Sequence, residues 1–113
     1  MPLRVVTVTS PEEVDDARDM SVAASQREIE AATAFERGDR ARALELNARS
    51  QAELEVVKKA APAKVAAELD AQQRAYSAHQ GTFATAPAGA AAAPVARDIG
   101  AKERKNSDRA LSY

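Results

Sequence analysis

The residues of this chain that can perform acid–base or metal chemistry are few and scattered. His79 is the only histidine, and the chain contains no cysteine. No Asp or Glu lies three or four residues from His79, so local spacing cannot place a second metal ligand beside it. General-base catalysis also requires a nucleophile and an orienting group, and no histidine–carboxylate network is apparent in the sequence. We therefore predict a surface or packed histidine and a protein with no catalytic residue, no cofactor and no metal.

A cluster of carboxylates near the N-terminus is the second candidate for chemistry. The glycine-containing spacing of calcium loops is absent there, which makes a cation site the less favoured alternative. Ser10, Pro11 and Glu13 instead form a helix-start signal, with a capping serine and a capping-box glutamate. We predict a helix that begins at Pro11 or near Ser21. The clustered carboxylates, which suit the positive end of its dipole, are Glu12, Glu13, Asp15, Asp16 and Asp19.

Composition argues against several classes of function. The 113 residues carry 16 basic and 17 acidic side chains, and the net charge is −1. Such a balanced charge does not favour nucleic acid or an anionic membrane. The four glycines lie too far apart for a phosphate-binding loop, and no small-molecule site is evident. No apolar run is long enough for a signal peptide or a membrane span, so we expect a soluble chain of undetermined compartment.

The middle of the sequence predicts an antiparallel helical hairpin. An amphipathic stretch ends at Gly38, a residue type that closes helices in the left-handed conformation. Asp39 can then cap a second helix that runs to about Ala60. Because so short a turn brings the two helices side by side, we expect an internal seam between them. Its members are Ile29, Phe35 and Leu44.

A third helix is predicted from Pro62 to about Gln80, before Gly81. Its apolar positions recur at spacings of three and four, as in a short coiled-coil seam. The seam residues are Val65, Leu69, Gln72, Tyr76, His79 and Phe83. We expect Leu69, Tyr76 and Phe83 to form an outward face that binds a partner.

The two ends of the chain give different predictions. Residues 3–9 are rich in β-branched side chains and predict a short strand within an N-terminal segment 1–10, where Val5, Val6 and Val8 can pair with a neighbouring sheet. Residues 81–113 are an Ala/Pro/Gly linker and a polar tail, which we expect to be disordered or ordered only on binding. The fold class expected is mainly α: the hairpin and third helix over residues 11–80, the strand, and a flexible tail.

Two resemblances involve the hairpin turn. Phe35-Glu-Arg-Gly-Asp-Arg-Ala-Arg-Ala-Leu44 resembles the turn of a tetratricopeptide hairpin, but no second copy follows. Together with Arg27-Glu28 and Ala31-Ala32, the same stretch resembles the C-terminal helical region of bacterial von Willebrand factor type A proteins, over residues 3–75. The family's Asp-x-Ser-x-Ser metal signature is absent, so no metal ligand carries over. The resemblance implies the accessory helical end of a larger protein.

These features favour a non-enzymatic helical protein–protein interaction module. Its partner would be another protein or a second copy of the chain, bound by burial of the seam residues. The alternative is a structural or assembly subunit that oligomerises through strand addition by residues 3–9 and through helix packing.

Overall fold

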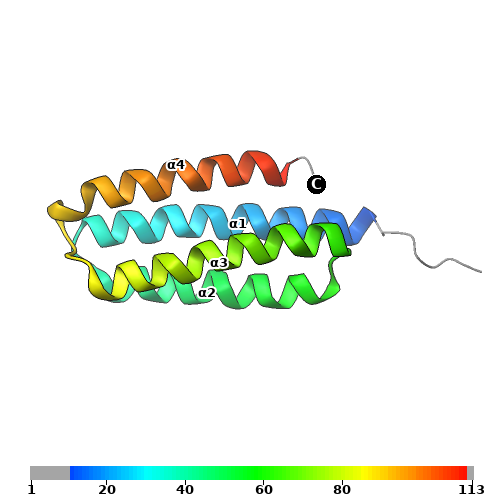
Figure 1. Ribbon diagram of the computed structural model, residues 1–113, viewed down its shortest axis with the longest axis horizontal. Helices are drawn as coiled ribbons and strands as arrows, with labels where there is room; N and C mark the ends of the chain where they lie inside the picture. The colour runs from blue at the N-terminus through cyan, green and yellow to red at the C-terminus, as the bar shows by residue number, and fades with distance from the viewer. Residues whose placement is uncertain (1–10, 112–113) are drawn as a thin grey trace, which may run out of the picture.

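The protein is an up-and-down arrangement of antiparallel helices. The computed structural model describes residues 11–111, and no strand occurs in that part of the chain. The mainly α fold class is thus confirmed, whereas the predicted strand at residues 3–9 lies outside the described residues. Figure 1 shows the helices side by side, joined by short connections. They are α1 (Pro11–Glu36), α2 (Arg40–Ala60), α3 (Ala63–Thr85) and α4 (Ala93–Ala110), with a 3-10 turn, η1 (Ala90–Ala92), before α4.

The hairpin between α1 and α2 forms as predicted. Helix α1 begins at Pro11, which decides between the two predicted starts. Gly38 ends it with a φ of 90°, a conformation that costs glycine little. The side chain of Asp39 accepts a hydrogen bond from the backbone nitrogen of Arg42 at 3.0 Å and so caps α2.

Helix α3 is longer than the sequence indicated. It begins after Pro62 but continues through Gly81 to Thr85. An internal glycine costs a helix only about 1 kcal/mol, and Phe83, in the added turn, is fully buried. The stabilisation gained by burying Phe83 outweighs the small cost of keeping Gly81 inside the helix.

Helix α4 corrects the prediction of a flexible tail. Residues 93–110 are helical and lie along α1. Their buried positions follow helical spacing, so one face of α4 can be covered. The interpretation of residues 81–113 as linker and tail was wrong for this helix because alanine-rich composition hid that spacing. The buried residues are Ala96, Ile99, Gly100, Glu103 and Ala110.

The connection before α4 is tied to the hairpin turn. The backbone nitrogen of Gly89 donates to the carbonyl oxygen of Phe35 at 2.9 Å. On the same end of the molecule, Arg40 donates to the carbonyl oxygens of Phe83 and Ala86, and its guanidinium lies 5.6 Å from the Phe35 ring centre. Arg40 therefore satisfies carbonyls at the C-terminal end of α3 that have no partner within the helix.

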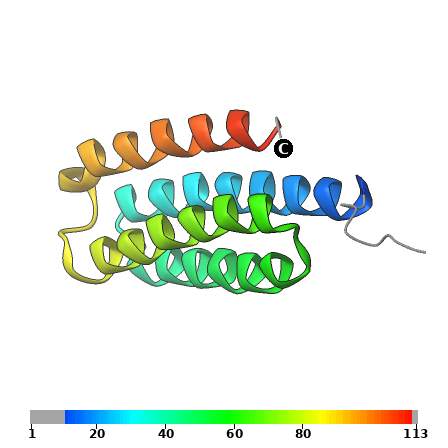
Figure 2. The same cartoon turned by 45° about the vertical axis from the view of Figure 1, so that its right-hand side comes forward.

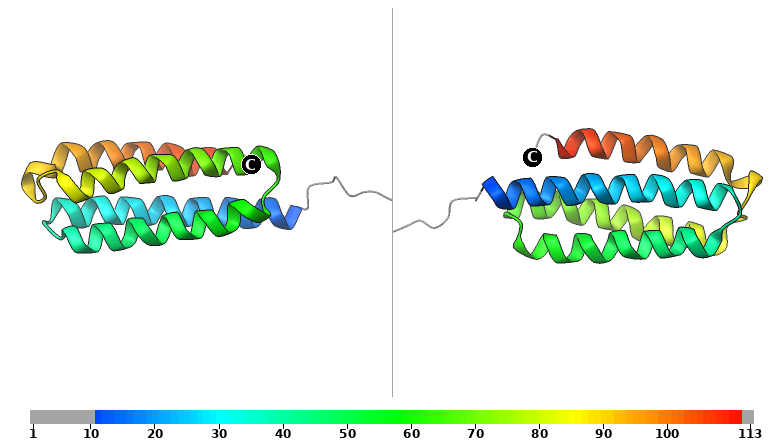
Figure 3. Two further views of the ribbon diagram at one scale, coloured as in Figure 1. Left: turned by 60° about the horizontal axis from the view of Figure 1, so that its bottom comes forward. Right: turned by 180° about the vertical axis from the view of Figure 1, so that it is seen from behind.

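The helices do not all contact one another equally. Helix α1 packs along both α2 and α4, and α2 packs along α3. The backbones of α3 and α4 lie farther apart, so these two helices meet through side chains such as Tyr76 and Glu103. Helix α4 stands apart from α3 in Figure 2. In the right-hand view of Figure 3, α1 likewise lies between α4 and the other two helices. The side of the bundle between α3 and α4 is therefore its least closed side.

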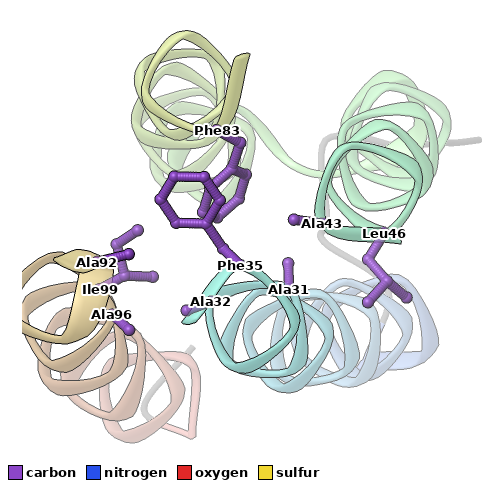
Figure 4. Close-up of a cluster of buried hydrophobic side chains, with 9 residues drawn as sticks. All are labelled: Ala31, Ala32, Phe35, Ala43, Leu46, Phe83, Ala92, Ala96 and Ile99. Atoms are coloured by element: carbon purple, nitrogen blue, oxygen red, sulfur yellow. The ribbon is translucent and has the colours of Figure 1, made fainter. Parts of the chain in front are cut away.

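Apolar side chains form two separate clusters along the bundle. The first, here the Phe35 cluster, lies near the α1–α2 turn, where the rings of Phe35 and Phe83 are 5.1 Å apart and Ile99 approaches from α4 (Figure 4). The second, here the Leu54 cluster, lies toward the opposite end. Its buried members are Ala17, Ala24, Leu54, Val65, Leu69 and Tyr76.

Candidate functional site: a buried polar layer beneath an open groove

A layer of buried polar side chains lies among the two apolar clusters. All four helices contribute to it, and most of its members are completely inaccessible to solvent. Burying polar groups is costly unless they bond to one another, so such a layer is the least expected part of an alanine-rich core. Its members are Ser21, Ser25 and Glu28 from α1, Asn47 and Ser50 from α2, Gln72, Tyr76 and His79 from α3, and Glu103 from α4.

One half of the layer is a histidine–carboxylate pair. His79 Nδ1 lies 2.8 Å from Glu28 Oε2, and Asn47 Nδ2 donates to the same oxygen at 3.2 Å. Asn47 Nδ2 also donates to the Tyr76 carbonyl oxygen at 2.9 Å. A proton on Nδ1 of His79 is the tautomer that lets the ring donate to the Glu28 carboxyl group. The other ring nitrogen of His79, Nε2, has no hydrogen-bond partner among the described residues.

The other half is centred on the hydroxyl of Tyr76. It donates to Glu103 Oε1, and it accepts from Gln72 Nε2 at 2.7 Å. Gln72 also reaches α1, where Ser21 Oγ donates to its Oε1 at 2.7 Å. The rings of Tyr76 and His79 stack with centres 5.6 Å apart, which joins the two halves. Two side chains of α3, Gln72 and Tyr76, thus connect α1 with α4.

Burial changes the acid–base properties of this layer. Desolvation raises the pKa of Glu103 above its usual value, against the opposing influence of the Tyr76 hydrogen bond and the His79 charge. Desolvation likewise raises the pKa of Tyr76, and the neighbouring Glu103 charge adds to that rise. Both shifts favour the protonated, neutral forms.

Two depressions lie above this layer, between α3 and α4. One has a volume of about 430 Å³ and is lined by His79 and Thr82 from α3 and by Val95 and Ile99 from α4, among others. The second, of about 140 Å³, is lined by Gln72 and Glu103, among others. Lys102 lines both, so they are neighbouring parts of one feature. We call it the α3/α4 groove.

Polar atoms without partners lie at the base of the α3/α4 groove. His79 is 9% exposed and Glu103 is 3% exposed, and each lines one of the depressions. Glu103 is hydrogen-bonded by the side chains of Tyr76 and Ser25, whereas His79 Nε2 has no hydrogen-bond partner among the described residues. Below them, Glu28 Oε1 is fully buried without a partner. The groove therefore presents both a nitrogen and a carboxyl oxygen that can bind a ligand.

The structure corrects the sequence interpretation of His79. The predicted absence of a histidine–carboxylate network is wrong, because Glu28 lies 51 residues away in sequence but contacts the ring. Spacing within one helix could not reveal a pair formed by α1 and α3. The available signal was the presence of polar residues on apolar faces, namely Gln72 and His79 within the seam and Ser25 within the α1 stripe.

The predicted outward face also lies inside the bundle. Leu69, Tyr76 and Phe83 are fully buried by the chain's own helices. The seam is buried, as its spacing predicted. Helices α1 and α2 of the same chain bury it, however, so the prediction that these three residues face outward was wrong. The other predicted interaction residues, Val5, Val6 and Val8, lie outside the described residues. Within the expected internal seam Phe35 is buried, while Ile29 and Leu44 are half-buried.

The described residues offer no obvious place for a metal or a membrane. No group of three or more His, Asp or Glu side chains between residues 11 and 111 is arranged to hold a metal ion. None of the helices in that range is both long and apolar enough to cross a bilayer.

Comparisons with known protein families, with curated proteins and with solved structures found no match for this chain. The resemblance to the helical region of von Willebrand factor type A proteins stays a sequence-based prediction.

Proposed function

We propose that this protein is a non-enzymatic helical interaction module whose α3/α4 groove receives a helix from a partner protein. The observation that carries the proposal is the incomplete closure of the bundle between α3 and α4, which leaves two adjoining depressions along one side. A helix laid in a groove is a common mode of peptide recognition.

The walls of the groove suit a helix of limited length. On α3 they are small, exposed side chains, Ala71, Ala75 and Ala78, which allow another backbone to approach closely. On α4, Val95 and Ile99 provide apolar surface. The α3 wall from Ala71 to Thr82 spans about 17 Å at 1.5 Å per residue, so it accommodates a helix of about three turns.

Two other functions have weaker support. An acid–base enzyme would use His79, but no Ser, Thr, Lys or Tyr side chain in the described part of the chain bonds to its free Nε2. Assembly by strand addition depends on residues 3–9, and no described contact bears on it. An accessory region of a von Willebrand factor type A protein is compatible with the proposal, since such a region would present its groove to another domain.

The test measures binding of a helical probe to the groove. The probe is a lactam-stapled, alanine-rich peptide of about three turns, because unconstrained helices of that length are unstable in water. We expect the peptide to shift backbone NMR signals of Ala71, Ala75 and Ala78. Ala75→Arg should abolish binding by filling the groove, whereas Ala52→Arg, at an exposed position of α2, should leave it intact.

Two results would contradict the proposal. One is binding that persists unchanged in Ala75→Arg, which would place the peptide on another surface. The other is a mass that doubles with concentration in light scattering and returns to the monomer value in Ala75→Arg, which would make a second copy the occupant of the groove. Circular dichroism of both variants verifies that each remains folded.

A further inference from the structure

The charges around the α3/α4 groove differ between its rim and its base. At the rim, Lys102 pairs with Asp98 at 3.0 Å, and Arg109 lies 3.6 Å from Glu68. These pairs leave the rim close to neutral. The charged side chains at the rim are also largely exposed, so solvent weakens their interactions.

The base carries more acidic than basic groups. Glu28 and Glu103 are both buried there, and His79 is the only basic side chain in the polar layer. Glu28 already has His79 and Asn47 as partners. Glu103 accepts from the Tyr76 hydroxyl on Oε1, Ser25 adds a second side-chain hydrogen bond, and the Glu103 carboxyl group lines the groove.

A neighbouring cation would relieve this imbalance. Burial and the proximity of Glu28 both raise the pKa of Glu103, and the hydrogen bonds from Tyr76 and Ser25 and the charge of His79 offset that rise only in part. A guanidinium or ammonium group would supply both a positive charge and a further hydrogen-bond donor. The nearby amides of Gln72 and Asn106 line the same depression and can accept further N–H groups.

We propose that the partner helix inserts one basic side chain, arginine or lysine, between α3 and α4 to bind the Glu103 carboxylate. This inference rests on the proposed function, since it concerns the same groove. It adds the chemistry of the partner: a helix with small or apolar residues that pack against Ala75 and Val95, and one basic residue at its centre. The buried contact at Glu103 is the specificity determinant.

The test compares two stapled peptides that differ by a single group. One carries arginine at its centre, and the other carries citrulline, the neutral isostere of arginine. A hydrogen bond to a charged group contributes about 1.5–3 kcal/mol. The arginine peptide should therefore bind wild-type protein at least about tenfold more tightly than the citrulline peptide.

Two variants test whether Glu103 is the source of the preference for the arginine peptide. Glu103→Gln keeps the side-chain volume and should remove the preference for arginine, so that both peptides bind alike. Asp98→Asn is the matched control, because Asp98 is a rim carboxylate that is largely exposed. In this control the preference for arginine should remain.

The outcomes separate the two proposals. Groove binding with equal affinity for arginine and citrulline overturns the inference about Glu103 and leaves the interaction module intact. A preference for arginine that survives in Glu103→Gln but disappears in Asp98→Asn also overturns it, because the rim would then be the source. Absence of any peptide binding to the groove overturns the proposed function itself. Circular dichroism confirms the fold of each variant.

Discussion

At the scale of single residues, the distinctive feature is the buried polar layer. Tyr76 bonds to α1 and α4 at once through Gln72, Ser25 and Glu103. Each bond contributes only about 1 kcal/mol net, but leaving one partner unsatisfied in the core costs more. The layer therefore specifies which helix faces meet more than it adds to stability.

The raised pKa of Glu103 predicts a characteristic pH dependence of stability. Between its usual value near 4.5 and its higher folded value, the folded protein holds a proton that the unfolded chain has released. The free energy of unfolding should therefore fall as the pH rises through that window, by at most about 1.4 kcal/mol per pH unit. The side chain introduced by Glu103→Gln has no such titratable proton. The free energy of unfolding of this variant should therefore lack this decrease with pH.

Urea unfolding of both proteins from pH 4 upward measures the effect. The groups that face Glu103 are Tyr76 and His79 on α3 and Glu28 on α1, and all three remain in the variant. The prediction would be contradicted if the free energy of unfolding changed with pH in the same way in the wild type and in Glu103→Gln. The measurements are made below pH 9. Above that pH, ionisation of tyrosine in the unfolded chain lowers the free energy of unfolding a second time.

At the scale of elements, α4 is the helix on which the groove depends. It packs along α1 and contributes one wall of the groove, with Ile99 entering the Phe35 cluster. A chain without this helix would expose the polar layer to solvent. Glu103 accepts a hydrogen bond from Tyr76 of α3, and Asn106 donates one to Ser25 of α1, and these two bonds fix the register of α4 along the bundle.

Truncation of Ile99 distinguishes a packed helix from a flexible tail. Ile99 is 4% exposed, and Ile99→Ala should lower the free energy of unfolding by about 2–5 kcal/mol, as cavity-forming substitutions do. Leu111→Ala is the control, since Leu111 is 66% exposed and should change stability by less than about 0.5 kcal/mol. Chemical denaturation measures both. Equal, small effects would mean that α4 does not pack on α1.

At the scale of the whole molecule, the seam of α3 is buried by other helices of the same chain. Leu69 has no exposed surface and lies in the Leu54 cluster with Ala17 of α1. Alanine-rich interfaces bury little area, so each large side chain carries an unusual share of the stabilisation. A charge at such a position should affect folding before it affects association.

Leu69→Asp should therefore lose most of its helical circular dichroism, because an unpaired carboxylate in the core is strongly destabilising. Val56→Asp, at a position that is 70% exposed, should keep the wild-type spectrum. Light scattering reports the mass of each variant in parallel. Retention of full helicity by Leu69→Asp with only a change in mass would restore the outward-face interpretation.

Local signals in the sequence determined the helical hairpin. Pro11, Gly38 and Asp39 act within one turn of the chain, so their residue types suffice to start, end and cap helices. The seam of α3 was also apparent, because its spacing of three and four residues is a property of one helix. The extension of α3 past Gly81 and the presence of α4 were not apparent from the sequence. Burial of Phe83 and Ile99 by other helices overrides weak local propensity there.

Only the tertiary structure decided what the polar residues do. Glu28 and His79 are 51 residues apart, and Ser25 and Asn106 are 81 apart. No periodicity within a helix encodes which faces of α1, α3 and α4 meet, because that depends on how four amphipathic helices share one core. The sequence by itself determined where α1 and α2 begin and which positions of α3 share one face. Packing decided that a histidine–carboxylate pair forms and that a groove above it stays open.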